Sequence, residues 1–248
     1  MPGSASKNRL FTNCPTINNL NLEDQITACP TCKQYCAKCC QHPKGTCHHH
    51  RLFFADGSCL NNGDGGARAG VGVAGSAENE DLQISKPFSD LVLGGGNTKR
   101  TSQIAELRAA IEAVAMISRF YDEYGPDEEE TPKPKLDYRK RKHQKISQDP
   151  EEPPFCVIAM DSQYVVKGMT DWLPKWKANG FKNAKGNEPA NLSLFLTLEQ
   201  DICRVEKKWV GGVVICFWWI PREYNKIADG LAQNAAKLDT GDMDPIFC

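Results

Sequence analysis

Residues of two kinds could carry out chemistry in this chain of 248 residues. The first kind forms a cluster of thiols and imidazoles near the N-terminus. Seven of the twelve cysteines and four of the five histidines lie between positions 14 and 50. The second kind is a set of carboxylates placed at the ends of expected strands and helices. Thiols and imidazoles suit zinc, whereas grouped carboxylates suit a hard divalent cation.

The Cys/His cluster contains one Cys-x-x-Cys pair, Cys29-Pro-Thr-Cys32. This spacing lets two sulfurs bind one ion through a tight turn, so we predict a structural zinc site here. The predicted ligands are Cys29, Cys32, Cys39 and either Cys40 or His42. The alternative is a reduced Cys-rich segment that binds no metal. The other five cysteines are scattered along the chain, as reduced intracellular thiols usually are.

Four acidic residues, Asp56, Glu106, Asp161 and Asp229, have positions suited to a shared site. Asp56 and Asp161 each follow a short apolar run, and the other two fall early in expected helices. Singly, each fits a turn or the dipole at the start of a helix. Together they would repel one another unless a cation neutralised them. The oxygen ligands would suit Mg²⁺ or Mn²⁺.

The elements that must position these groups have an α/β pattern. Strands are expected at 51–55, at two places between 71 and 93 with a Gly-rich hairpin turn at 63–72, at 156–160 and at 213–220. Helices are expected from the apolar spacing of 104–117 and of 228–238, with Asn225 as the N-cap of the second. We divide the chain into a flexible leader (1–28), the Cys/His-rich module (29–50), one domain (51–240) with a disordered insertion at about 122–154, and a tail (241–248).

The composition of the chain limits the kinds of partner that the protein can be expected to bind. The formal net charge is −1, so nucleic-acid binding would depend on local patches. No apolar run approaches the ~20 residues that cross a bilayer, and we expect no membrane partner. The leader has Lys7 and Arg9 and no acid before Glu23, which is too little for a transit peptide. The expected compartment is the nucleus or the cytoplasm, with the mitochondrion left open.

Five segments together resemble ribonuclease H type 1, and they occur in that family's order. They are 56–62, 101–107, 160–166, 172–181 and 225–232, and the resemblance covers residues 51 to about 240. It implies an α/β fold with a five-stranded mixed sheet, three strands antiparallel and two parallel, flanked by helices. It also implies a monomer that hydrolyses the RNA strand of RNA/DNA hybrids, leaving 5′-phosphate and 3′-hydroxyl ends.

The resemblance assigns roles to individual residues. Asp56, Glu106, Asp161 and Asp229 become a catalytic tetrad that holds two Mg²⁺ or Mn²⁺ ions. Contacts to the substrate are implied for Asn62, Ser102 and Gln103 in the minor groove, for Tyr164, Trp172 and Trp176 along the DNA strand, and for Thr101, Asn191 and Lys99 or Arg100 at a DNA phosphate. Residues 167–186 carry five lysines against one aspartate, which suits a phosphate backbone.

The chain departs from the family in the loop before the last acid. This loop reads Pro221-Arg222-Glu223-Tyr224-Asn225 and lacks the family's usual histidine. We therefore predict lower turnover, with Glu223 as a partial substitute for that histidine. Two alternatives stay open: a nucleic-acid-binding module that keeps the fold without turnover, and a ribonuclease H domain derived from a retroelement. The presence of all four acids favours an active enzyme.

Overall fold

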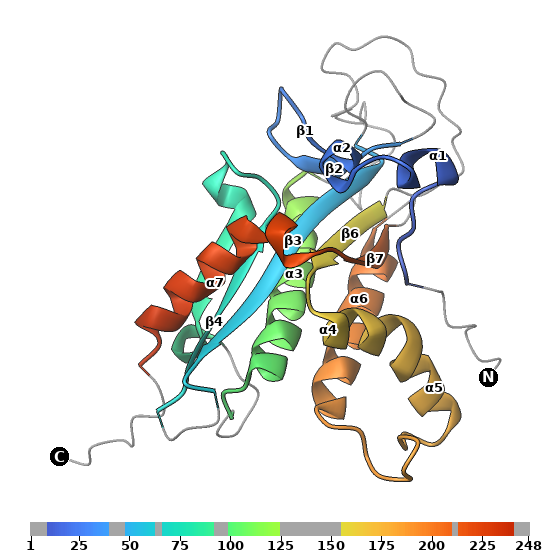
Figure 1. The fold of residues 1–248 in the computed structure, drawn as a ribbon, viewed down its shortest axis with the longest axis vertical. Helices are drawn as coiled ribbons and strands as arrows, with labels where there is room; N and C mark the ends of the chain where they lie inside the picture. The colour runs from blue at the N-terminus through green and yellow to red at the C-terminus, as the bar shows by residue number, and fades with distance from the viewer. Residues whose placement is uncertain are drawn as a thin grey trace.

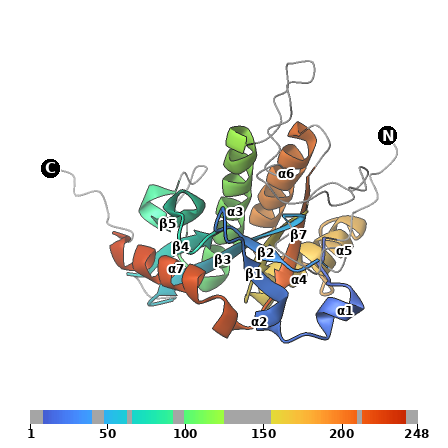
Figure 2. The ribbon, with the colours of Figure 1, turned by 90° about the horizontal axis from the view of Figure 1, so that it is seen from above.

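The computed structural model describes residues 9–39, 48–62, 66–91, 99–124, 155–209 and 213–240. One mixed sheet runs through the centre, and helices lie on both of its faces (Figures 1 and 2). The insertion predicted at about 122–154 lies outside the described residues from 125 onward, whereas 122–124 are the last residues of a long helix. The tail 241–248 also lies outside them.

Five strands form the predicted mixed sheet. β3 (His50–Leu60), β4 (Arg68–Ala74) and β5 (Gln83–Pro87) are antiparallel neighbours. β6 (Phe155–Met160) pairs in parallel with β3, and β7 (Val214–Trp219) pairs in parallel with β6. The three antiparallel and two parallel strands implied by the resemblance are thus confirmed.

A hairpin that was not predicted extends this sheet to seven strands. β1 (Ile26–Ala28) pairs with β2 (Tyr35–Ala37), and β2 joins β3 where Cys36 lies opposite Arg51. Two short helices precede the hairpin, α1 (Pro15–Asn18) and α2 (Leu22–Gln25). The prediction of a flexible leader over 1–28 is therefore wrong for residues 9–28, while residues 1–8 lie outside the described part.

Tertiary contacts order this N-terminal segment. Phe11 is buried, and its ring packs edge-on against His50 and Trp218 at centroid distances of 5.3 and 5.6 Å. Its amide donates a 2.8 Å hydrogen bond to the carbonyl of Phe217, which adds the segment to the free edge of β7. Helices and strands of three or four residues leave no periodic pattern, so the sequence alone could not reveal them.

The main helices divide between the two faces of the sheet (Figure 2). α3 (Ser102–Tyr124) and α6 (Leu192–Lys208) pack together on one face, and α7 (Lys226–Leu238) covers β4 on the other. Between β6 and α6 lie α4 (Gln163–Lys167), η3 (Gly168–Trp172), which has π-helical hydrogen bonding, and α5 (Leu173–Ala178). Three 3-10 turns complete the set: η1 (Glu80–Leu82), η2 (Phe88–Asp90) and η4 (Arg222–Tyr224).

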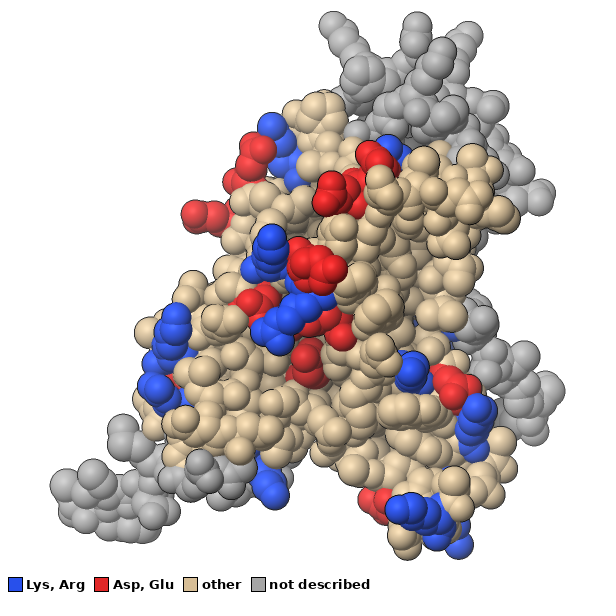
Figure 3. Space-filling view, viewed as in Figure 1, with Lys and Arg blue, Asp and Glu red and all other residues tan. Residues whose placement is uncertain are grey.

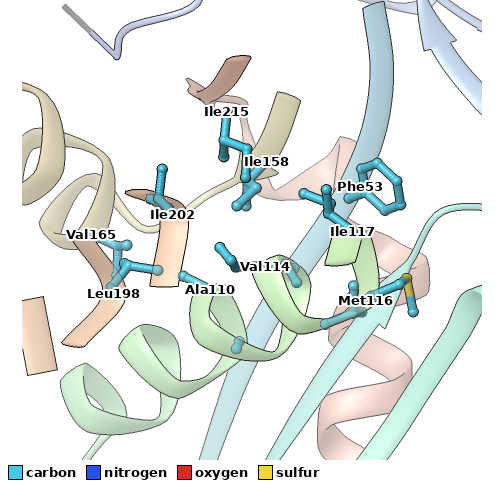
Figure 4. Close-up of a cluster of buried hydrophobic side chains, with 14 of the residues drawn as sticks. Phe53, Ala110, Val114, Met116, Ile117, Ile158, Val165, Leu198, Ile202 and Ile215 are labelled. Atoms are coloured by element: carbon cyan, nitrogen blue, oxygen red, sulfur yellow. The ribbon is translucent and has the colours of Figure 1, made fainter. Parts of the chain in front are cut away.

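Successive side chains of β3 point to opposite faces of the sheet and so contribute to two hydrophobic cores. Phe53 and Ala55 face the larger core under α3 and α6, where Val114, Ile158 and Leu198 also gather (Figure 4). Leu52 and Phe54 face the smaller core. That second core lies against α7 and the N-terminal segment, because it also contains Phe11 and Ala228 and packs against Leu22 and Ile26. The N-terminal segment is therefore part of the fold.

Glycines bring two helices unusually close to the sheet. A Cβ atom added at Gly57 would lie 2.1 Å from the carbonyl carbon of Ala105 in α3. One added at Gly72 would lie 2.2 Å from the carbonyl oxygen of Ala228 in α7. The prediction of a turn over 63–72 is wrong for residues 68–72, because these residues belong to β4. The glycines there let α7 lie close to the strand. Residues 63–65 lie outside the described part.

Candidate active site

Two strands place the first two carboxylates side by side. Asp56 lies within β3, which continues to Leu60 instead of ending at Asp56 as predicted. Asp161 directly follows β6. The parallel register pairs Phe54 with Ala159, so continuing it by two residues brings Asp56 level with Asp161.

The third carboxylate comes from the first turns of α3. Because Gly57 has no side chain, α3 lies against β3 at this point, and the nearby Gly57 amide partly offsets the effect of burial on the pKa of Glu106. One oxygen from each of Asp56, Glu106 and Asp161 lies within 4.8 Å of the other two. The structure thus brings together three of the four predicted acids.

Burial and mutual repulsion both disfavour charge in this group. Burial first, and then the negative charges of Asp161 and Asp229, raise the pKa of Asp56 to about 7, while Arg222 opposes the shift. Burial, followed by the charges of Asp56 and Asp161, raises the pKa of Glu106 well above its ordinary value. Glu106 Oε2 is buried and has no hydrogen-bond partner among the described atoms. A buried carboxylate with an unpartnered oxygen, grouped with two other carboxylates, fits a divalent cation held by oxygen ligands.

Asn225 has a role that the sequence pattern did not indicate. It occupies the predicted N-cap position of α7, but its side chain caps no amide of that helix. Its Nδ2 instead donates to the Ala55 carbonyl at 3.0 Å and to Asp161 Oδ1 at 2.9 Å. Trp219 Nε1 donates to the Asp161 carbonyl at 3.1 Å. The buried Asn225 therefore orients one carboxylate of the group and ties it to β3.

The fourth predicted acid is held differently. Asp229 Oδ1 accepts a 2.6 Å hydrogen bond from Arg222 Nη2, and its Oδ2 accepts a 2.7 Å bond from Gln233 Nε2. It is close enough to influence Asp56 electrostatically but is not one of the three grouped acids. Arg222 is exposed and belongs to the loop that lacks histidine, as does the exposed Glu223. The structure thus adds a guanidinium to the edge of the site.

Polar residues predicted to read the substrate lie near the ends of β3 and α3. Asn62 and Gln103 are exposed, and Ser102 is half-buried at the first residue of α3. Thr101 acts as an N-cap, since its Oγ1 accepts a 3.3 Å hydrogen bond from the Ile104 amide. Of these residues, Ser102 and Gln103 lie about one turn before Glu106 on α3 and offer hydrogen-bond donors and acceptors there.

Lys99 and Arg100, the two residues predicted as the cation for a phosphate, have different environments in the structure. Arg100 is buried, and its Nε donates a 2.6 Å hydrogen bond to Asp239 Oδ2. Asp239 also accepts hydrogen bonds from the amides of Ala69 and Ser89. Arg100 is therefore a structural residue, and the exposed Lys99 remains the candidate.

The predicted aromatic residues form one connected cluster. Tyr164 and Trp172 have ring centroids 5.8 Å apart, Trp172 and Trp176 are 6.1 Å apart, and Trp176 packs on the buried Phe195 at 5.4 Å. Asn191 Nδ2 donates a 3.0 Å hydrogen bond to the Tyr164 hydroxyl. Both tryptophans are half-buried, so they serve as the rim of the core and also leave ring surface to solvent. Basic side chains lie at several places along the edge of the molecule at α5, with acidic side chains beside them (Figure 3).

The predicted zinc ligands are only partly brought together. Cys29, Cys32 and His48 form a group of three, although His48 was not among the residues chosen. Cys39 is buried outside this group, because the hairpin carries it away from the turn that holds Cys29 and Cys32. Cys40 and His42 lie outside the described residues.

Comparison with known proteins identifies the family. The family model for RNase H matches residues 143–237. Ribonuclease H from Actinobacillus pleuropneumoniae serotype 5b (strain L20) is 30% identical over 190 residues, which are 76% of this chain and 91% of that protein. Ribonuclease H from Haemophilus influenzae (strain 86-028NP) is 27% identical over 190 residues, covering 76% and 90%.

Solved structures with related folds have lower similarity. LC11-RNase H1, isolated from compost, is 18% identical with a TM-score of 0.42, covering 75% of this chain and 95% of that one. The PFV RNase H domain is 20% identical with a TM-score of 0.47, covering 76% and 94%. The family assignment therefore depends on the sequence relatives.

On that basis, the chain belongs to the ribonuclease H family, and it is an enzyme of that class. The regions that carry Asp56 and Glu106 precede the stretch matched by the family model, but the 190-residue alignments are too long to be confined to that stretch. Across the described part of the chain, every helix is too short or too polar to span a bilayer.

Proposed function

We propose that this protein cleaves the RNA strand of RNA/DNA hybrids at a two-metal site built on Asp56, Glu106, Asp161 and Asp229. Cleavage would leave 5′-phosphate and 3′-hydroxyl ends, and Mg²⁺ or Mn²⁺ would be the cofactor. Family membership supports the ribonuclease H activity. The single observation that carries the choice of site is the group of three carboxylates with the buried, unpartnered Glu106 Oε2.

The carboxylates differ in their burial and in their hydrogen bonds, so each would contribute differently to holding cations. Asp56, at the centre of the group, is nearly fully buried and faces negative charge from both Asp161 and Asp229. Asp161 Oδ1 accepts a 2.9 Å hydrogen bond from Asn225 Nδ2, so this ligand would be oriented before any ion arrives. Ions held by these carboxylates would supply the activation of a water molecule and the stabilisation of the leaving oxygen of the scissile phosphate.

Asp229 and Arg222 form an ion pair at the edge of the site, and this pair could rearrange when substrate binds. Their ion pair at 2.6 Å engages one oxygen of Asp229, which is not among the three grouped acids. The Arg222 side chain is largely exposed, so a phosphate of the substrate can compete for its guanidinium. Asp229 would then be available as the fourth ligand.

Substrate selection is assigned to groups on either side of the acids. Asn62, Ser102 and Gln103 offer hydrogen bonds to 2′-hydroxyl groups, which distinguish RNA from DNA in a wide minor groove. Lys99 and the half-buried rings of Trp172 and Trp176 suit the phosphates and sugars of the DNA strand.

The test is cleavage of a labelled RNA/DNA hybrid by the full-length protein with Mg²⁺, with Mn²⁺ and with chelator. Duplex RNA and duplex DNA are the substrate controls, and the product ends are read by enzymatic labelling. Cutting of the hybrid RNA alone, dependent on metal, is the expected result.

Asp161→Asn and Asp122→Asn make a matched pair for this assay. Asp161→Asn should reduce cleavage by at least about 10²-fold while hybrid binding persists, because it weakens the hold on the metal ions that would stabilise the transition state. Asp122 lies near the other end of α3 and pairs with Lys208, so Asp122→Asn should cleave normally. Tight hybrid binding without cleavage by the unaltered protein would favour the binding-module alternative instead.

A further inference from the structure

The tip of the β1–β2 hairpin gathers three side chains that are typical zinc ligands. Cys29 and Cys32 lie in the turn, and His48 lies two residues before β3. Cys32 Sγ and His48 Nε2 are 3.0 Å apart, and the donor atoms of all three residues lie within 4.8 Å of one another. This group is separate from the carboxylates, and ribonuclease H chemistry makes no use of it.

The spacing of these atoms suits one tetrahedral ion. Zinc binds sulfur at about 2.3 Å and imidazole nitrogen at about 2.0–2.1 Å, which places neighbouring ligand atoms roughly 3.5–3.8 Å apart. The 3.0 Å between Cys32 Sγ and His48 Nε2 is shorter than that range and the other separations are at most 4.8 Å, so small movements of side chains would bring the three atoms to ligand spacing. Cys29 and Cys32 are both free thiols here.

The backbone of the turn has the form that presents two sulfurs to one ion. The Lys33 amide donates a 2.9 Å hydrogen bond to the Cys29 carbonyl, and the Cys29 amide donates a 2.9 Å bond to the Gln34 carbonyl. Lys33 has a φ of +63°, which reverses the chain directly after Cys32. The chain therefore folds back within five residues and brings both thiols to one side of the turn.

Contacts with the sheet hold this turn and His48 in place relative to each other. Gln34 and Arg51 are both buried and joined by a side-chain hydrogen bond, and Gln34 also bridges to Ser76. Lys33 pairs with Glu78 at 3.1 Å. Since Arg51 is only three residues after His48, the same contacts fix both parts of the group.

We propose that Cys29, Cys32 and His48 bind one Zn²⁺ ion that fastens the hairpin to the chain entering β3. Two thiolates neutralise the charge of the ion, and the imidazole binds through Nε2. Cys32 is exposed, so the ion lies near the surface and exchanges with strong chelators in solution. Its role is structural, because it joins the N-terminal segment to the strand that carries Asp56.

The experiment measures zinc bound to the full-length protein, reduced and reconstituted with Zn²⁺ alone, by elemental analysis. Cys32→Ser and His48→Ala should each lose about one equivalent of zinc per chain. Cys203→Ser is the control for the loss of a thiol, since Cys203 lies in α6, and it should retain all its zinc. Zinc content unchanged in both ligand variants, or no zinc in the unaltered protein, would overturn the proposal.

A second measurement keeps the proposal falsifiable if a variant folds poorly. Co²⁺ bound to the unaltered protein should show the visible bands of a tetrahedral site together with thiolate-to-cobalt charge-transfer absorption. His48→Cys should keep the metal and raise the charge-transfer absorption, because a third thiolate replaces the imidazole. A disulfide between Cys29 and Cys32 in freshly reduced and reconstituted protein, with no cobalt spectrum, would contradict the site.

Discussion

At the scale of single residues, the carboxylate group depends on neighbours that keep it in place. Asn225 donates to Asp161 Oδ1 and to the Ala55 carbonyl from a fully enclosed position. Asn225→Ala should lower hybrid cleavage by about 10–100-fold, as losing a group that orients a metal ligand usually does. The measurement is the Mg²⁺ dependence of cleavage.

The expected signature for Asn225→Ala is a higher Mg²⁺ concentration for half-maximal activity, with hybrid affinity unchanged. Asn234→Ala, at an exposed position of the same helix, is the matched control and should behave like the unaltered protein. Equal Mg²⁺ dependence in both variants would show that Asn225 matters only for folding.

The same acids destabilise the fold when no metal is bound. The pKa of Asp56 is raised to about 7 by burial first and by Asp161 and Asp229 next, so its ionised form is disfavoured in the folded protein. Asp56→Asn should therefore raise the free energy of unfolding in chelator at pH 8 by on the order of 1 kcal/mol, about 2–4 °C in Tm. Calorimetry in chelator tests this, and a lower Tm would mean that Asp56 makes a stabilising contact instead.

From the sequence, the chemistry of these residues could be predicted more fully than the contacts that hold them in place. Three acids predicted from their positions and from the family resemblance do meet, because strand register and helix position follow from hydrophobic patterns. Asn225 was assigned to a helix cap because its sequence position fits one equally well. Its actual partners come from β3 and from the end of β6, and no local pattern encodes such distant contacts.

At the scale of elements, the close approach of α3 to β3 sets the position of Glu106. A Cβ atom at Gly57 would overlap the backbone of Ala105, so Gly57→Ala should force α3 outward. The expected cost is about 1–3 kcal/mol of stability, with a larger loss of activity than of hybrid binding. Thermal unfolding and cleavage, measured together, check this.

Gly66→Ala is the control for Gly57→Ala, because a Cβ at Gly66 would meet open space. Both variants make the same chemical change, so any difference between them reports the contact with α3. Similar behaviour of the two would mean that α3 does not need this close approach.

A buried ion pair closes α7 onto the start of α3. Burial alone would raise the pKa of Asp239, but hydrogen bonds from Arg100 and from the Ala69 and Ser89 amides lower it below its ordinary value. The folded protein thus favours the charged form, so this stabilisation is full above the unfolded pKa of about 3.9 and is lost as pH falls through the folded value.

Asp239→Asn should therefore cost about 3–5 kcal/mol at pH 7, since it leaves the buried Arg100 without its charge partner. The difference in stability between the variant and the unaltered protein should shrink below about pH 4, where the carboxylate itself becomes protonated. Denaturant unfolding across pH measures that difference. A constant difference from pH 7 to pH 3 would argue against the ion pair.

Long, patterned elements were predictable and short ones were not. The strands at 51–55 and 156–160 and the helices of α3 and α7 carry strong apolar patterns, and all of them formed. The hairpin of β1 and β2 was hidden among cysteines and polar residues, because strands of three residues are too short to show alternation. Its order comes from contacts with β3 and with the loop around Ser76.

At the scale of the whole molecule, the N-terminal segment and the α/β domain should unfold as one unit. Phe11 and Ile17 are buried, and the segment reaches both the edge of β7 and the second core. Arg9 also forms an ion pair with Glu206, a residue of α6, with 2.8 Å between Arg9 Nη1 and Glu206 Oε1. A cooperative unit predicts one calorimetric transition for the full chain.

Phe11→Ala tests that cooperativity, because it removes the ring that packs between His50 and Trp218. The expected loss is about 3 kcal/mol, which lowers the single Tm by roughly 6–12 °C in a chain of this size. Leu20→Ala, at an exposed apolar residue of the same segment, should change the Tm little. The contrary result would be a separate transition at lower temperature in Phe11→Ala, with the main Tm unchanged. The segment would then be an appended unit, and its contacts with the second core would add nothing to the stability of the catalytic fold.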